Sequence, residues 1–164
     1  MKHYEEIVEP FTTVPQGATV LTEQKLALTR DFKPTGWFGK NVWVRAVLDV
    51  VVLHRSKALV VDWKTGKRLD EDDQLALCAG VLMAQQKDVD SVRTAFVWLQ
   101  EEPGSGNLTT VREYTRDDLP KIWERFLNRE ERWQRAFANN EFPARPSGLC
   151  RKWCPVTQCS YHGG

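Results

Sequence analysis

Two aspartates and a lysine carry the chemistry that this sequence most clearly predicts. Asp62 and Lys64 stand near the end of an apolar run, and Asp49 interrupts a second apolar run that precedes it in the chain. Carboxylates are ligands that Mg²⁺ and Mn²⁺ prefer, and a lysine beside them offers a fixed positive charge. This set is the minimum for metal-dependent phosphodiester cleavage. The alternative is a strand-end salt bridge without a catalytic role, for example between Asp62 and Arg45.

The two apolar runs predict neighbouring strands that position these side chains. Side chains alternate between the faces of a strand, so Asp62 and Lys64 should point the same way. Asp49 is predicted to be the one acid on a mostly apolar face, where an isolated charge is costly to bury. We therefore expect it to be paired, protonated or bound to a cation. The opposite face of its strand should be wholly apolar, with Val42, Val44, Ala46, Leu48, Val50 and Val52.

Hydrophobic periodicity and turn residues predict the other elements. A capping pattern at residues 115–118 starts a second helix, whose apolar stripe we expect in the core rather than stacked on bases. The elements predict an α/β fold with a mixed central sheet flanked by helices. Strands are expected at 20–29, 41–54 and 58–64, a buried helix at 71–86, and a hairpin at 91–100 and 108–114. The stripe consists of Leu119, Ile122, Trp123, Phe126, Leu127, Trp133 and Phe137.

The string V-V-D-W-K-T-G-K, followed by D-Q-L-A-L, resembles the RecB-like branch of the PD-(D/E)XK nuclease superfamily. That branch includes CRISPR-associated exonucleases and many phage nucleases. Asp49 matches its first acid, Asp62 its second, Lys64 its lysine and Gln74 the glutamine of the following helix. Cys78 stands where the family usually has tyrosine, so an aromatic role there is not expected. The resemblance covers roughly residues 20 to 162.

The resemblance implies a single restriction-endonuclease-like domain over 1–164. Its parts would be a partial N-terminal helical region at 1–18, the nuclease core at 19–145 and a Cys-rich metal-binding tail at 146–164. The implied function is a metal-dependent DNA nuclease, with exonuclease character, in recombination, repair or phage DNA processing. Its implied partners are DNA and a recombination or replication protein. A phage-encoded protein in a bacterial host would fit this resemblance.

The expected mechanism is hydrolysis assisted by Mg²⁺ or Mn²⁺. Asp49, Asp62 and the backbone carbonyl of Trp63 are the expected ligands, and the cation would activate water and polarise the phosphate. Lys64 would position that water or stabilise charge on the phosphorane. Gln74 would contact the DNA backbone or orient Lys64.

Members of this branch usually carry an N-terminal helix with a metal-binding histidine. Only His3 is available in that region, and we expect it to be exposed to solvent because chain ends fray. Glu23 could supply the extra carboxylate instead, although it could equally be a surface acid beside Lys25. The chain could also be a shortened member of the family or one part of a split nuclease.

Three cysteines and a histidine cluster at the C-terminus. Cys150, Cys154, Cys159 and His162 fall within thirteen residues, and four such ligands suit tetrahedral Zn²⁺. The same ending resembles the terminal cysteines of RecB-like nucleases, which implies a 4Fe–4S cluster with Cys78 as the fourth thiolate. Otherwise Cys78 is a small core residue. Unlinked cysteines are the remaining interpretation.

Composition limits how the chain could bind DNA. The 164 residues fit one domain, and 41% hydrophobic residues suffice for a core. Because the net charge is only +1, DNA binding would require a local basic patch, which we place at Lys40, Arg45, Lys67 and Arg68. The absence of a long apolar stretch predicts a cytoplasmic, intracellular protein without a membrane partner. Two other functions are possible from the sequence. The chain could be a non-catalytic DNA-binding or assembly module, or a zinc-stapled protein-interaction domain.

Overall fold

The structure is a computed structural model that describes residues 13–68, 73–102 and 104–163. Its contacts divide the chain into two compact units, Met1–Arg125 and Phe126–Gly164. The first contains the sheet, and the second contains most of the last helix and the tail. Within the described residues, no helix is long and apolar enough to cross a membrane. His3 and most of the predicted N-terminal region lie outside the described residues.

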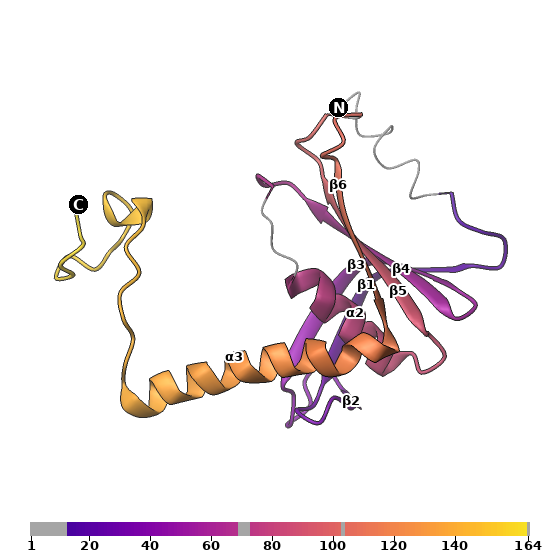
Figure 1. The fold of residues 1–164 in the computed structure, drawn as a ribbon, viewed down its shortest axis with the longest axis horizontal. Coiled ribbons are helices and arrows are strands. Elements are labelled where there is room, and N and C mark those ends of the chain that lie inside the picture. Colours follow the sequence, from indigo (N-terminus) through magenta and orange to yellow (C-terminus); the bar gives the residue numbers. More distant parts are fainter. Residues whose placement is uncertain (1–12, 69–72, 103, 164) are drawn as a thin grey trace. The chain divides into compact units, whose positions relative to one another are not determined.

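The first unit is built on a six-stranded mixed sheet with the order β2-β1-β3-β4-β5-β6 (Figure 1). Helix α2, Asp73–Gln85, connects β4 to β5, and these two strands are parallel. The other neighbours are antiparallel, as expected for strands joined by short connections. The strands are β1 (Thr19–Leu28), β2 (Pro34–Thr35), β3 (Val44–His54), β4 (Lys57–Lys64), β5 (Ser91–Trp98) and β6 (Thr109–Thr115). The mixed α/β fold predicted from the sequence is confirmed.

Helix α2 covers one face of the sheet and forms the main core. Its apolar residues surround the helix, as the sequence predicts, because the helix is buried on nearly all sides. The core cluster joins α2 to β3, β4 and β5. Its fully buried members include Leu48, Val51, Val60, Ala79, Met83 and Val92.

Gly80 of α2 allows a close approach of the helix α3, Leu119–Asn139. A Cβ atom at Gly80 would lie 2.8 Å from the indole of Trp123, which no real contact tolerates. We therefore expect Gly80→Val to destabilise the fold by about 2–3 kcal/mol through overpacking. Thermal or urea unfolding measures this loss. Gly66→Val is the matched control, because the space at Gly66 is open, and an equal loss in both variants would contradict the packing role.

The strict alternation predicted for the strand that carries Asp49 is wrong. Leu48 and Val51, three residues apart, both pack in the cluster under α2, whereas Val50 packs on the other face of the sheet. The strand therefore changes face at Asp49. The neighbouring strand is distorted at the same level, since Glu23 has a left-handed φ of 50°. Paired distortions keep the two strands in one register.

The second predicted helix begins with a 3-10 turn at Arg116–Asp118 and continues as α3. The core placement of its apolar stripe is correct for Ile122 and Trp123, which are buried. It is wrong for Trp133 and Phe137, which are 63% and 55% exposed. These two rings belong to the second unit, whose described residues contain no strand to cover them, and they pack on each other with centroids 4.2 Å apart.

Candidate active site

The site begins where the pairing of β3 with β4 ends. Their backbone pairing extends from the hairpin only to Val50 and Val61. Beyond that point, the carboxylate of Asp49 accepts a hydrogen bond from the backbone N–H of Trp63 at 3.0 Å. A side chain thus takes the role that a strand carbonyl would otherwise have. The two strands form a fork, and the acids predicted from the sequence lie at its base.

Asp62, Lys64 and Gln74 form a closed ring of contacts in this fork. The Lys64 Nζ atom lies 2.7 Å from Asp62 Oδ2 and donates to Gln74 Oε1 at 2.8 Å. Gln74 Nε2 donates in turn to Asp62 Oδ1 at 2.8 Å. Lys64 ends β4 and Gln74 lies in the first turn of α2, so strand and helix fix the lysine together. The salt bridge considered between Asp62 and Arg45 does not form, because Lys64 takes that place.

The electrostatics of Asp62 are unusual for a carboxylate. The residue is only 8% exposed, and burial raises the pKa of its carboxyl group. The charge of Lys64 opposes this shift, the charge of Asp49 adds to it, and Gln74 opposes it. A buried carboxylate whose ionisation is disfavoured by burial and by a neighbouring acid is a common arrangement where a cation binds.

One oxygen of Asp62 remains unsatisfied by hydrogen bonds. Oδ2 is buried, and among the described residues no donor approaches it with hydrogen-bond geometry. Its partner is the Lys64 ammonium, in an ion pair at 2.7 Å. An oxygen with this one ion-pair partner still has a lone pair to offer, and carboxylate oxygens are ligands that hard divalent cations prefer. The donor chemistry at this position therefore fits Mg²⁺ or Mn²⁺.

One aromatic side chain, Phe96, and one thiol, Cys78, lie near the contacts among Asp62, Lys64 and Gln74. The Lys64 ammonium lies 4.6 Å from the ring centroid of Phe96 on β5, a cation–π contact. Sequence inspection misses Phe96, because nothing in its own strand links it to a lysine 32 residues earlier. Cys78 is buried in the core, and burial first and the charge of Asp62 second raise its pKa to about 12. It is therefore a neutral thiol rather than a nucleophile.

Glu23 lies on β1 at the level of Asp49. Its neighbours Thr22 and Gln24 pair with Val50 and Leu48, which flank Asp49 on β3. The side chain of Glu23 is exposed. In the described part of the chain, no three His, Cys, Asp or Glu side chains gather closely enough to hold a metal ion. Among the described residues, Asp49 and Asp62 are therefore not joined by Glu23 in a group of three metal ligands.

The four cations predicted to bind DNA fall into two groups. Lys40 and Lys67 are exposed. Arg45 donates from Nε to the carbonyl of Trp37 at 2.7 Å, and Arg68 donates to Asn107 Oδ1 at 2.9 Å. Both arginines are thus oriented by the protein.

The tail of the second unit folds back on itself through backbone hydrogen bonds. Gly163 N–H donates to the carbonyl of Cys150 at 3.0 Å, and His162 N–H donates to that of Cys159 at 2.9 Å. Its three cysteines are unpaired thiols of intermediate exposure. The tail side chains are among the described residues in which no group of three metal ligands gathers. The structure brings the ends of the segment together without assembling the predicted ligand set.

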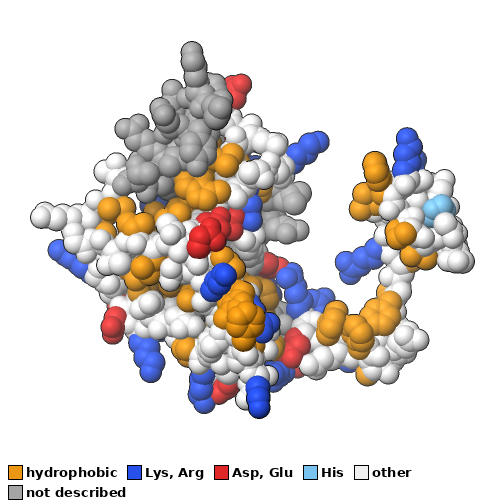
Figure 2. Space-filling view, turned by 180° about the vertical axis from the view of Figure 1, so that it is seen from behind, with side chains coloured by type: hydrophobic (Ala, Val, Ile, Leu, Met, Phe, Trp, Pro, Cys, Tyr) orange, Lys and Arg blue, Asp and Glu red, His pale blue; other side chains and the backbone are white. Residues whose placement is uncertain are grey.

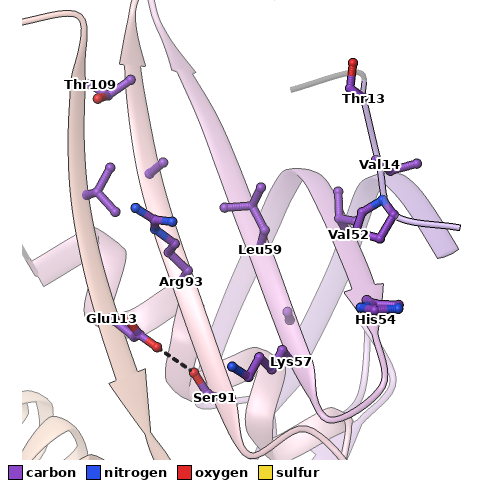
Figure 3. A pocket seen from close by; sticks show the side chains of 14 residues that line it. Thr13, Val14, Val52, His54, Lys57, Leu59, Ser91, Arg93, Thr109 and Glu113 are labelled. Carbon is purple, nitrogen blue, oxygen red and sulfur yellow. Dashed lines mark hydrogen bonds between the residues drawn. The ribbon is translucent and has the colours of Figure 1, made fainter. Parts of the chain in front are cut away.

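A groove of about 710 Å³ lies on the opposite face of the sheet from α2 (Figure 3). Its polar side chains include Arg93 and Lys57, and Glu113 accepts a hydrogen bond from Ser91 at 3.1 Å. His54 ends β3 and lines this groove. Asp49, Asp62 and Lys64 are not among the lining residues. The groove is therefore separate from the fork.

Comparison with known families agrees with the geometry of the fork. The chain matches the model of the PD-(D/E)XK nuclease superfamily over residues 5–159. Members of this superfamily are typically metal-dependent nucleases. A comparison with curated proteins finds no match. The family match covers nearly the whole length, and the two acids and the lysine lie within it, where the pairing of β3 and β4 ends. This chain therefore belongs to the PD-(D/E)XK nuclease superfamily.

Proposed function

We propose that the chain is a Mg²⁺- or Mn²⁺-dependent deoxyribonuclease of the RecB-like branch, with exonuclease activity. The observation that carries the proposal is the contact ring of Asp62, Lys64 and Gln74, in which one buried carboxylate oxygen lacks a hydrogen bond. A salt bridge kept only for stability would not need a glutamine that contacts both of its partners. The glutamine in the first turn of α2 is also the feature that supports the RecB-like branch.

The carboxylates of Asp49 and Asp62, with the backbone carbonyl of Trp63, would hold the cation. When bound, the cation supplies a Lewis acid that polarises the scissile phosphate and lowers the pKa of a coordinated water. Asp49 on β3 also accepts a hydrogen bond from the backbone N–H of Trp63 on β4, which ties the carboxylate of one strand to the backbone of the other. A fixed ligand set costs little reorganisation during the reaction.

Lys64 would stabilise the negative charge that develops on the phosphorane. Gln74 and the ring of Phe96 contact its ammonium and would keep it in place if Asp62 held a cation. A preoriented ammonium in a partly dry site stabilises such charge better than a mobile one. Gln74 is thus a positioning residue for Lys64, which is the second of the roles considered for it.

DNA would lie over the fork through contacts to its phosphates. Lys40 and Lys67 are free to meet the backbone, while Arg45 and Arg68 offer oriented guanidinium groups. The net charge of +1 means that these local cations supply the attraction. Binding of this kind tracks the backbone and is indifferent to base sequence. It suits processing of DNA ends in recombination, repair or phage replication, beside a recombination or replication protein.

The test is cleavage of labelled DNA by the purified chain. Linear single-stranded, linear duplex and closed circular DNA are incubated with Mn²⁺, Mg²⁺ or EDTA. We expect Mn²⁺- or Mg²⁺-dependent loss of the linear substrates and survival of the circle, which distinguishes an exonuclease from an endonuclease. DNA binding without cleavage under every metal condition would replace the proposal by a non-catalytic DNA-binding or assembly module.

We also propose a structural Zn²⁺ in the tail, held by Cys150, Cys154, Cys159 and His162, with a 4Fe–4S cluster as the alternative. The backbone hydrogen bond that joins Gly163 to Cys150 supports it, because it closes the segment into a loop. The ligands must still turn toward one another, and the energy of metal binding would drive that step.

Cys154→Ser is expected to release the tail metal and to lower thermal stability, because a closed thiolate site contributes folding energy directly. Elemental analysis should find about one zinc per wild-type chain, and less in the variant. Ser160→Ala, which removes a neighbouring side chain that is not a ligand, should keep the metal. Several irons per chain would favour the cluster, and neither metal would leave the cysteines unlinked.

A further inference from the structure

The loop that connects β1 to β3 is held in a defined conformation by backbone hydrogen bonds. The backbone N–H of Trp43 donates to the carbonyl of Leu28 at 2.8 Å and closes it. At its tip, Gly39 N–H donates to the carbonyl of Gly36, also at 2.8 Å. A Cβ atom at Gly39 would lie 2.6 Å from the Thr35 hydroxyl and 3.0 Å from the Gly36 carbonyl, so only glycine fits there. The turn at the tip therefore has one defined conformation.

Aromatic side chains anchor this loop from within the first unit. Phe32 stacks on Trp123 with ring centroids 4.6 Å apart, and Trp43 meets Phe32 edge to face at 5.6 Å. Arg45 binds the carbonyl of Trp37, and its guanidinium lies 5.8 Å from the centroid of the Trp37 ring. Offset and edge-to-face aromatic pairs of this kind hold their partners in fixed geometry. The loop is thus rigid up to the residue at its tip.

Phe38 at that tip is 90% exposed, more than any other large hydrophobic side chain among the described residues. Single exposed apolar residues are common and need no explanation alone. Here the ring stands on a fixed turn, with Lys40 two residues later and the guanidinium of Arg45 bound to the adjoining Trp37. Hydrophobic side chains beside Lys and Arg are also visible on the face drawn in Figure 2.

A flat exposed ring beside cations matches the chemistry of single-stranded nucleic acid. Proteins that hold single strands stack unpaired bases on aromatic rings and place cations along the phosphates. Duplex DNA offers no free base face along its length, so an exposed ring gains little from it. A protein surface as partner would satisfy the ring but would not use the neighbouring cations in the same way.

The loop lies at the end of the sheet where the fork opens. β3 runs from the loop to Asp49, and β4, which is antiparallel to it, ends with Lys64 at the same side. Arg45 and Asp49 are four residues apart on β3, about 13 Å at strand spacing.

We propose that Phe38 stacks on an unpaired base of the strand that enters the fork, so that the site selects DNA with single-stranded or frayed ends over blunt duplex. The proposal rests on the proposed function for its DNA partner. It assigns Phe38 a binding role and no part in the chemistry.

The experiment compares DNA binding by full-length wild type, Phe38→Ala and Phe38→Trp in EDTA, where no cleavage occurs. Fluorescence anisotropy gives the affinity for a duplex with a single-stranded overhang and for a blunt duplex of the same length. Loss of one base–aromatic stack should weaken overhang binding by about 5- to 100-fold in Phe38→Ala. Blunt-duplex binding should change by less than about twofold. Phe38→Trp should bind both DNAs as wild type does, because it keeps the stacking face.

Phe142→Ala is the matched control, because it removes an exposed ring of the same type from the second unit, and it should leave both affinities unchanged. Equal affinities of Phe38→Ala and wild type for the overhang, or an equal loss on both DNAs, would overturn the proposal. The outcome separates from that of the nuclease assay. If Phe38→Ala lost affinity only for the overhang and the wild-type protein cleaved no DNA, the stacking proposal would stand and the nuclease proposal would fail. If the wild-type protein cleaved DNA and Phe38→Ala bound the overhang as wild type does, the nuclease proposal would stand and the stacking proposal would fail.

Discussion

Asp62→Ala should reduce DNA cleavage by at least about 10³-fold, because it removes the buried carboxylate that would hold the catalytic cation. Lys64→Ala should lose about 10²- to 10³-fold, since it removes a preoriented charge that acts in the transition state. Single-turnover rates on linear DNA at saturating protein measure both losses. Such rates report the chemical step rather than binding.

The controls for these variants lie on the same unit. Lys57→Ala removes the exposed lysine at the opposite end of β4, and Asp88→Ala removes an exposed aspartate after α2. Both should cleave DNA at the wild-type rate. Circular dichroism should show that all four variants are folded. If a folded Asp62→Ala protein cleaved DNA at the wild-type rate, the fork would have no role in the reaction. The family match would then have no active site assigned to it.

Mn²⁺ should raise the melting temperature of the wild-type protein, because a ligand that binds only the folded state stabilises it. At about 100 times its dissociation constant the gain is about 2.7 kcal/mol, or roughly 5–10 °C. Asp62→Asn should lose this gain, since its amide is a weak ligand for a hard cation. Differential scanning fluorimetry with and without EDTA measures the effect. An equal metal-induced shift in wild type and Asp62→Asn would place the cation elsewhere.

The pH dependence without metal follows from the raised pKa of Asp62. The folded state binds this proton more tightly than the unfolded state does, so the contribution to stability is fully present below the unfolded pKa. It is lost as pH rises through the folded pKa. At neutral pH, metal-free Asp62→Asn should therefore melt no lower than wild type, and its advantage should vanish in acid. A variant less stable at neutral pH would show that the ion pair with Lys64 outweighs burial.

Several features of this site follow from the sequence alone, because they depend on local geometry. Asp62 and Lys64 share a face since they are two residues apart on a strand, and the structure places their charged atoms 2.7 Å apart. The apolar composition of residues 75–84 predicts a buried helix, and α2 is buried. Gln74 could be assigned to the site only through the family resemblance, because it reaches Lys64 from another element.

Other features were decided by contacts between distant parts of the chain. The face change at Asp49 breaks a local period of two, and it occurs opposite Glu23 on β1, whose φ is left-handed. The separation of β3 from β4 lets Asp49 reach the backbone of Trp63, fourteen residues away. The ring of Phe96 meets Lys64 only because β5 joins β4 in parallel after the α2 crossover.

The aromatic residues show the same division. Helical spacing alone treats Trp123, Trp133 and Phe137 alike, since all three belong to one apolar stripe. The structure buries Trp123 against Gly80 and Phe32, and leaves the other two exposed on a unit without strands among its described residues. The sequence determines which side chains gain free energy when they are buried away from water. Which of them find a partner surface depends on packing between elements far apart in the chain, and no local period encodes that packing.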